Sequence, residues 1–262
     1  MESVSLVCVI YNHYKETVEK MVSSAVNCLQ YCSYLDYDII IVDNSEDSLL
    51  DCSLLNNICN NKLIYIKSDT NLGYCGGNNL GIKNSPSDYI IITNPDIIFL
   101  EALCFDWIVG YSKFKNTISG KLVGCNKWYT YASSFPTDRK YSPEELPFYY
   151  NEPTLKKPGN WKSFKYIDGS LMCFPKKLWE DVGGFDEDYF PGYFGENVFA
   201  FKAYLKGYIL QNSEIHNYYK HEHGKDRSDE QKIMEWSKEG RRLFYEKYAL
   251  PNYDKFLKYL NN

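Results

Sequence analysis

Two short polar clusters each follow a run of apolar residues, and their side chains could bind a ligand. Asp43 comes directly after residues 39–42, and Asn94 and Asp96 come after residues 89–92. Carboxylates and amides can hold a hard cation or accept hydrogen bonds from a bound molecule. Asp and Asn also end strands and begin turns in many proteins, which is the simpler interpretation of either cluster alone. Two clusters at equivalent positions favour a binding site.

A glycine-rich turn between the two clusters is suited to phosphate groups. Four glycines fall within residues 73–81, and Asn71 precedes them. Glycine lets the backbone approach a ligand closely, and the N–H groups that open a helix suit phosphate oxygens. A dinucleotide-binding fingerprint would directly follow the first strand, where this chain has Tyr11 and Asn12, and no Gly-Lys-Ser/Thr follows the glycines. A Rossmann dehydrogenase and a P-loop protein are therefore excluded.

The two polar clusters can form one site only if the strands that they follow end side by side in a sheet. The chain contains four short apolar runs typical of buried parallel strands, residues 6–10, 39–42, 63–66 and 89–92. Apolar residues at helical spacing follow the first run, over residues 18–29. This alternation predicts an α/β fold with a mostly parallel sheet, flanked by helices. Ligands bind such sheets at the carboxyl ends of the strands, where both polar clusters lie.

In the second half of the chain, proline and glycine mark the ends of predicted helices. Pro175 predicts a helix over residues 176–182 that ends at Gly183. A later helix begins near Glu196 and ends before Gly207. A Glu in the first turn of a helix is favoured by the helix dipole, which also helps to keep the carboxylate ionised.

From residue 229 the chain is predicted to form a helical tail. Apolar residues recur there at helical spacing, and Arg241, Arg242 and Lys247 are basic. Such a tail can pack on the core or touch the inner leaflet of a membrane. We expect packing, because the basic run is short.

Composition and charge narrow the class of protein. The 262 residues carry 34 acidic and 29 basic side chains, a net charge of −5, which argues against duplex nucleic acid as a partner. The first residues lack the basic start of a signal peptide, and no apolar run is long enough to span a membrane. The nine Cys residues contain no Cys-x-x-Cys pair, so we expect reduced, mostly buried thiols in a cytoplasmic protein.

The order of these motifs resembles glycosyltransferase family 2, and in particular its rhamnosyltransferase-like branch. The resemblance covers residues 4 to about 228, and its segments are residues 7–12, 42–45, 71–81, 94–96, 168–170, 183–187 and 193–207. It implies a GT-A fold, which is Rossmann-like, and the transfer of a sugar from a nucleotide donor with inversion of the anomeric carbon.

The resemblance also implies a donor site. The family holds the donor diphosphate through a cation bound by Asp-x-Asp, and here Asn94 replaces the first Asp, which leaves Asp96 to bind Mn²⁺ or Mg²⁺. The cation would stabilise the charge that the departing nucleoside diphosphate gains. Asp43 would accept the ring N3–H of a pyrimidine, which favours a UDP- or dTDP-linked donor. The other implied donor-binding residues are Tyr11, Asn12, Asn71, Gly73, Gly77 and Asn79.

The acceptor half departs from the family at the residue expected to act as base. The family has the pair Glu-Asp at the start of the helix that here ends before Gly207. When the two sequences are aligned backwards from Gly207 without gaps, Glu196 takes the position of the family's Asp. We expect Glu196 to be the general base of a single displacement, with a purely capping role as the alternative. His221 fits the family's metal-ligand His; an exposed loop His is the alternative for it and, more strongly, for His223. The implied acceptor-binding residues are Asp168, Gly169, Ser170 and Asp186.

We therefore expect a GT-A domain over residues 1–228, with a nucleotide-binding half at 1–100 and an acceptor-binding half at 101–228, and a C-terminal helical extension at 229–262. The expected enzyme transfers a hexose, with rhamnose as one candidate, to a saccharide or lipid-linked saccharide in surface polysaccharide synthesis. One alternative is an inactive relative that only binds nucleotide sugars. A sugar-phosphate nucleotidyltransferase is less favoured, because the chain lacks a Gly-rich, Arg-containing loop after its first strand.

Overall fold

A computed structural model describes most of the chain. The described residues are 2–12, 15–48, 50–115, 117–123, 134–137, 139–146, 161–213, 215–222 and 230–261. Most of the Pro- and Tyr-rich segment between residues 124 and 160 lies outside them, and so does His223.

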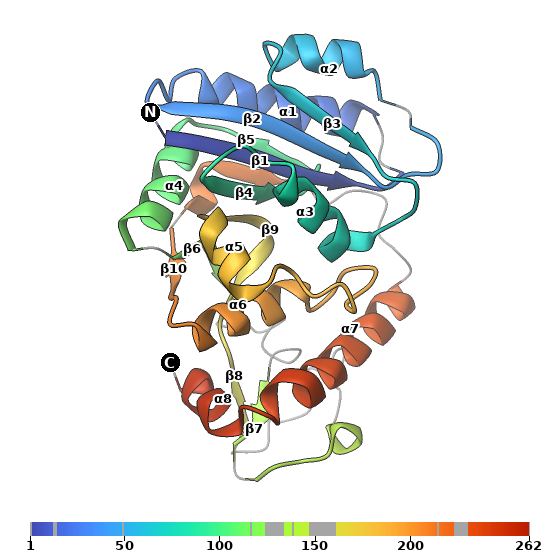
Figure 1. Ribbon diagram of the computed structural model, residues 1–262, viewed down its shortest axis with the longest axis vertical. Coiled ribbons are helices and arrows are strands. Elements are labelled where there is room, and N and C mark those ends of the chain that lie inside the picture. The colour runs from blue at the N-terminus through green and yellow to red at the C-terminus, as the bar shows by residue number, and fades with distance from the viewer. Residues whose placement is uncertain are drawn as a thin grey trace.

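The centre of the molecule is a seven-stranded sheet in the order β10-β6-β9-β4-β1-β2-β3 (Figure 1). Its strands are β1 (Glu2–Ile10), β2 (Leu35–Asp43), β3 (Leu63–Lys67), β4 (Tyr89–Thr93), β6 (Ile118–Val123), β9 (Tyr166–Pro175) and β10 (Leu210–Asn212). Only β9 runs antiparallel to its neighbours β4 and β6; the other neighbouring strands are parallel. The prediction of a mostly parallel sheet is confirmed.

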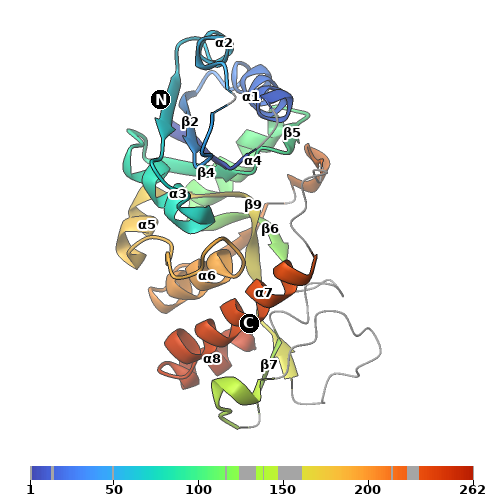
Figure 2. The ribbon, with the colours of Figure 1, turned by 90° about the vertical axis from the view of Figure 1, so that its right-hand side faces the viewer.

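Helices cover both faces of the sheet because side chains along each strand alternate between two apolar layers. Ile39 and Ile41 of β2 belong to the layer packed against the first helix, and Ile40 and Val42 belong to the layer on the other face. One layer contains α1 (Lys15–Leu29), α2 (Cys52–Ile58) and α4 (Leu103–Lys115), and the other contains α3 (Gly73–Lys83), α5 (Lys176–Val182) and α6 (Gly195–Leu205) (Figure 2).

The local signals of helix α5 appear in the structure as predicted. Pro175 precedes the helix with an extended backbone, and Gly183 follows it with a φ of +73°. Glycine adopts this left-handed conformation without the steric cost of a Cβ atom. The predicted helix over residues 176–182 is confirmed to the residue.

The C-terminal tail consists of α7 (Glu230–Phe244), a π-helical turn (Tyr245–Ala249) and α8 (Tyr253–Leu260). It packs beside a two-stranded ribbon of β7 (Ser134–Pro136) and β8 (Trp161–Ser163), next to the short helix η1 (Pro143–Glu145) (Figures 1 and 2). Its buried aromatic side chains surround Phe135 and join the apolar layer that includes α5 and α6. The prediction that the tail packs on the core is confirmed.

The basic residues of the tail are engaged within the chain. Arg241 is only 2% exposed, with its guanidinium 4.7 Å from the centre of the Phe135 ring. Arg242 forms ion pairs with two glutamates of the tail, and Lys247 pairs with Asp186 and with Asp188. The alternative, in which the tail contacts an anionic membrane leaflet, depended on these three basic residues, and all three already interact with other residues of the chain. Among the described residues, no helix combines the length and apolar character needed to cross a membrane.

Candidate active site

Three neighbouring strands bring the predicted donor-site residues to one edge of the sheet. Strand β1 lies between β4 and β2, and its register pairs Ile10 with Asp43 and Cys8 with Thr93. Asn12, Asp43 and Asn94 therefore leave the sheet at the same edge, as expected for the carboxyl ends of parallel strands.

Asp43 is buried at this edge and held by hydrogen bonds. Its Oδ1 accepts from the backbone N–H of Ser45 at 2.9 Å, and its Oδ2 accepts from the Tyr65 hydroxyl at 2.8 Å. Burial is the largest influence on the pKa of Asp43 and opposes ionisation, but hydrogen bonds from Ser45, Ser48 and Tyr65 together outweigh it and lower the pKa. Asp43 is thus held as an ionised acceptor, and only 1% of the residue is exposed.

Tyr11 and Asn12 follow β1 on the surface beside Asp43. Tyr11 is 45% exposed, and the backbone N–H of Asn12 donates to Ser45 Oγ at 2.8 Å. Asn12 has a φ of +52°, a conformation that Asn tolerates better than most residues. This segment therefore turns sharply at the strand end and shares Ser45 with the Asp43 loop.

The glycine-rich turn forms the start of α3. Asn71 Oδ1 accepts the N–H of Gly73 at 2.9 Å, so this side chain stabilises the turn. A methyl group on Gly77 would lie 2.6 Å from Val9 Cγ1 and 3.1 Å from Asn44 Nδ2. The glycines therefore let α3 pack closely against β1 and the loop after β2.

Asn79 has a structural role instead of the predicted donor-binding role. Its amide NH₂ donates to the Phe185 carbonyl at 2.9 Å and to Glu187 Oε1 at 2.8 Å. Its carbonyl oxygen accepts from Trp179 Nε1 and from the Phe185 N–H, both at 2.9 Å. An amide side chain has two donor hydrogens and two lone pairs, so Asn79 has no capacity left for a ribose or a diphosphate. It ties α3 to the turn after α5.

Asp96 and His221 meet although they are far apart in the sequence. Strand β5 (Ile97–Phe99) pairs antiparallel with β11 (Tyr219–His221), in a register that places His221 opposite Ile97. The Glu222 N–H donates to the Asp96 carbonyl oxygen at 2.8 Å, and His221 Nε2 lies 3.1 Å from Asp96 Oδ1. Both side chains are partly exposed, 17% for Asp96 and 23% for His221.

This pair fits a divalent cation as two of its ligands. Adjacent ligand atoms around an octahedral cation lie about 3 Å apart, which is the separation found here. No third His, Cys, Asp or Glu of the described part of the chain joins the pair. The other positions would thus belong to water and substrate oxygens, as is usual for Mg²⁺, while the imidazole suits Mn²⁺ better.

The start of α6 faces the middle of β9. Glu196 lies in the first turn of α6, and a methyl group on Gly169 would lie 3.4 Å from its Cβ. The Tyr74 hydroxyl, on α3, donates to the Gly169 carbonyl at 2.8 Å. Asp168 Oδ1 accepts the Ser170 N–H at 2.9 Å, and the Ser170 carbonyl accepts the Asn94 N–H at 2.9 Å. The predicted base, the residues 168–170 and the Asn94 strand end are thus brought together.

The pKa of Glu196 is raised to about 7. Burial is the main cause and the negative charge of Asp168 adds to it, while the hydrogen bond from its own backbone N–H has the opposite effect. The start of the helix favours the ionised form of Glu196, as expected, but burial outweighs this influence. A carboxylate with a pKa near neutrality is well suited to take a proton from a hydroxyl group.

This pKa predicts a pH dependence. If Glu196 is the base, turnover should rise about tenfold per pH unit up to pH 7 and then level off, because only the carboxylate accepts a proton. We would measure kcat at saturating donor from about pH 5 to about pH 9. Asp168→Asn should move the acidic limb of the curve of kcat against pH to lower pH, since this change removes a negative charge beside Glu196. If kcat of the wild type levels off already near the ordinary pKa of Glu, the assignment of Glu196 as the base would be contradicted.

Asp186, which is predicted to contact an acceptor, is held by the C-terminal tail. Lys247 Nζ lies 2.7 Å from Asp186 Oδ2, and the Tyr248 hydroxyl donates to the same oxygen. Burial is the largest influence on the pKa of Asp186 and raises it, but these two hydrogen bonds outweigh burial and the pKa is lowered. Asp186 thus anchors the loop before α6 to the tail.

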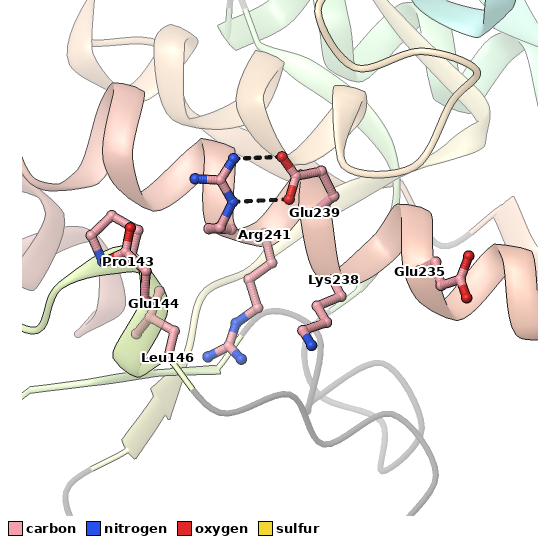
Figure 3. A pocket seen from close by; sticks show the side chains of 8 residues that line it. Pro143, Glu144, Leu146, Glu235, Lys238, Glu239 and Arg241 are labelled. Carbon is pink, nitrogen blue, oxygen red and sulfur yellow. Dashed lines mark hydrogen bonds and ion pairs between the residues drawn. The ribbon is translucent and has the colours of Figure 1, made fainter.

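A cavity of about 420 Å³ lies on the tail (Figure 3). It is lined by Pro143, Glu144, Leu146, Glu235, Lys238, Glu239, Arg241 and Arg242. Arg241 and Lys238 extend from α7 to the same side (Figure 3). Its walls carry both signs of charge and include none of the predicted site residues.

Two residues that build the site were missed in the sequence. Tyr65 holds Asp43, and Tyr74 holds Gly169. Both are Tyr residues in a chain that contains 25 of them, and no spacing distinguishes them from the others. Their roles depend on which strands and helices become neighbours.

Comparison with known proteins supports the resemblance found in the motifs. Residues 5–117 match the family model described as Glycosyl transferase family 2. A curated relative, the low-salt glycan biosynthesis hexosyltransferase Agl10 of Haloferax volcanii, is 27% identical over 176 residues, which cover 63% of this chain and 53% of the relative. The chain thus spans about half the length of this relative.

Two solved structures have a similar fold. The mannosyltransferase PcManGT of Pyrobaculum calidifontis, in complex with GDP-Man and Mn²⁺, has a TM-score of 0.51 at 14% identity over 80% of this chain and 54% of its own. GalNAc-T7 with UDP, GalNAc and Mn²⁺ has a TM-score of 0.57 at 16% identity over 80% of this chain and 41% of its own. The fold is therefore that of the GT-A glycosyltransferases. The N-terminal part of the chain, residues 5–117, is thus similar in sequence to glycosyl transferase family 2.

Proposed function

We propose that this protein is an inverting glycosyltransferase that transfers a hexose from a UDP- or dTDP-linked donor to a saccharide or lipid-linked saccharide acceptor. The observation that carries the proposal is the meeting of Asp96 and His221, 3.1 Å apart at the edge where Asp43 and the start of α3 also lie. The hexosyltransferase activity in the name of the Haloferax relative and the nucleotide sugars in the names of the structural neighbours support it.

Each group has a distinct task in this mechanism. Asp43 accepts a ring N–H of the donor base, and the positive end of the α3 helix dipole attracts the diphosphate. Asp96 and His221 would hold Mn²⁺ or Mg²⁺, which supplies positive charge to the departing diphosphate when bound. Glu196 takes the proton of the acceptor hydroxyl as that oxygen attacks the anomeric carbon. One base and one displacement give inversion, so no covalent sugar intermediate on the protein is needed.

The decisive experiment is a transfer assay. The purified protein is incubated with Mn²⁺ and a panel of UDP-, dTDP- and GDP-linked hexoses, including dTDP-rhamnose, and release of nucleoside diphosphate is measured with and without saccharide acceptors. Release that increases with an acceptor supports the proposal. Binding of nucleotide sugars without hydrolysis or transfer would instead identify an inactive relative.

The Asp43 contact predicts the choice of nucleotide. UDP or dTDP should raise the melting temperature of the protein more than GDP or ADP, because donor binding stabilises the folded state. Asp43→Ala should remove this preference, and Asp38→Ala, near the amino end of the same strand, should leave it unchanged. Equal shifts with all four nucleotides, or a larger shift with GDP, would contradict the pyrimidine assignment.

A further inference from the structure

Helix α7 of the tail lies directly against the segment that precedes α6. Gly240 makes the closest approach: a methyl group there would lie 3.0 Å from the Tyr193 carbonyl oxygen and 3.0 Å from Phe194 Cβ. An added methyl group would therefore require its neighbours to move by a few tenths of an ångström. The position of α7 is thus coupled to the backbone of residues 193 and 194.

Phe194 adopts an unusual backbone conformation at this contact. Its φ is +77°, in the left-handed region that bulky residues rarely adopt. Strained residues of this kind persist only where the surrounding structure holds them. Phe194 is 4% exposed, and its ring lies 5.9 Å from that of Phe244 at the end of α7. Helix α7 therefore packs on both the backbone and the ring of Phe194.

The conformation of Phe194 sets the start of α6. Phe194 is the residue that precedes the helix, and its carbonyl accepts the N–H of Val198 at 3.0 Å. Glu196 lies two residues later, in the first turn. A shift of Phe194 would consequently move Glu196 relative to Gly169 and Asp168 on β9.

Two further contacts join the tail to the same loop. The rings of Tyr193 and Trp236 are stacked, with centroids 5.8 Å apart. Lys247 and Tyr248 bond to Asp186, near the beginning of the loop. The loop between α5 and α6 is thus attached to the tail near both of its ends.

We propose that α7 positions Glu196 for catalysis, and that Gly240 is the positioning residue through which it does so. The proposal rests on the proposed function, in which Glu196 is the base. It assigns a catalytic role to the tail, which lies outside the part of the chain that matches the family.

The test is Gly240→Ala, compared with Gly110→Ala as the matched control. Gly110 lies on α4, and a methyl group there would meet nothing within 4 Å. Gly240→Ala should lower kcat about 3–10-fold with an unchanged donor Kd, since displacement of a reacting group by about 1 Å can cost about 100-fold and the expected shift is a few tenths of an ångström. The acidic limb of its pH profile should also move below that of the wild type, because displacement admits water to Glu196. Gly110→Ala should behave as the wild type.

A second pair of variants covers the case in which Gly240→Ala fails to fold. Trp236→Ala should lower kcat with unchanged donor Kd, and Trp236→Phe should restore most of it by keeping the ring stack. Wild-type kcat and pH profile in both Gly240→Ala and Trp236→Ala would overturn the proposal. A loss of donor binding in step with kcat would overturn it too, by showing a merely structural role. If the wild type itself transfers no sugar, the proposed function fails instead.

Discussion

Glu196→Gln is expected to lower turnover by about 10²–10⁴-fold, the usual contribution of a general base. The amide keeps the shape of the side chain at the start of α6 but has no useful basicity. The donor Kd should stay nearly unchanged, because Glu196 faces β9 and the donor residues lie at the ends of β1, β2 and β4. Turnover and donor Kd would be measured at about pH 8, where wild-type Glu196 is mostly ionised.

Three variants serve as comparisons for Glu196→Gln. Glu180→Gln makes the same change at an exposed position of α5 and should turn over as the wild type. Asp168→Asn and Asp186→Asn test the two rival carboxylates; Asp186 is occupied by Lys247 and Tyr248, so its change should act mainly through the loop before α6. If Glu196→Gln turns over normally and Asp168→Asn does not, the base has been assigned to the wrong residue.

Asp96→Ala is expected to abolish the part of donor binding that depends on a divalent cation. Asp96 is the only carboxylate left in the motif, since Asn94 replaces the other. For the wild type, donor at about 100 times its Kd stabilises the fold by about 2.7 kcal/mol, which is several degrees in melting temperature. With Asp96→Ala, this shift should be the same in Mn²⁺ as in a chelator. His221→Ala should reduce it less, because a neutral imidazole attracts the cation less than a carboxylate does.

The control for this prediction is Asp36→Ala, near the amino end of β2. Asp36 is well exposed and pairs with Lys62, on the edge of the sheet opposite the candidate site. This variant should keep the full metal-dependent shift. Wild-type activity that persists in excess chelator would contradict the prediction and would show that positive side chains stabilise the leaving group.

Much of the framework of this protein can be predicted from local sequence. The apolar runs of β1 to β4, the helical spacing in α1 and the Pro and Gly residues around α5 mark elements that the structure contains, although β1 and β2 each begin four residues before the predicted runs. These signals are local because they follow from the period of each element and from the backbone preferences of single residues. The edge that gathers Asp43 and Asn94 is predictable for the same reason, since parallel strands share their carboxyl ends.

The identity of the site residues depends on contacts between distant parts of the chain. Asn79 fits a donor-binding motif, but its four hydrogen bonds go to residues more than 99 positions away. Asp186 fits an acceptor motif, but the tail occupies it. Side-chain type gives the bonding capacity of a residue, whereas its neighbours decide whether that capacity remains for a ligand.

The amino-acid sequence alone gives the first four parallel strands, the family-like motifs and the departure from them at Asn94 and Glu196. The meeting of His221 with Asp96 depends on the three-dimensional fold, through the pairing of β11 with β5. The fold also gives Glu196 a pKa of about 7, because burial beside Asp168 opposes its charge more than the start of the helix favours it. Burial and the charges near a side chain depend on all the residues that surround it in space. Most of these residues are distant in the sequence, so no periodicity along the chain predicts them.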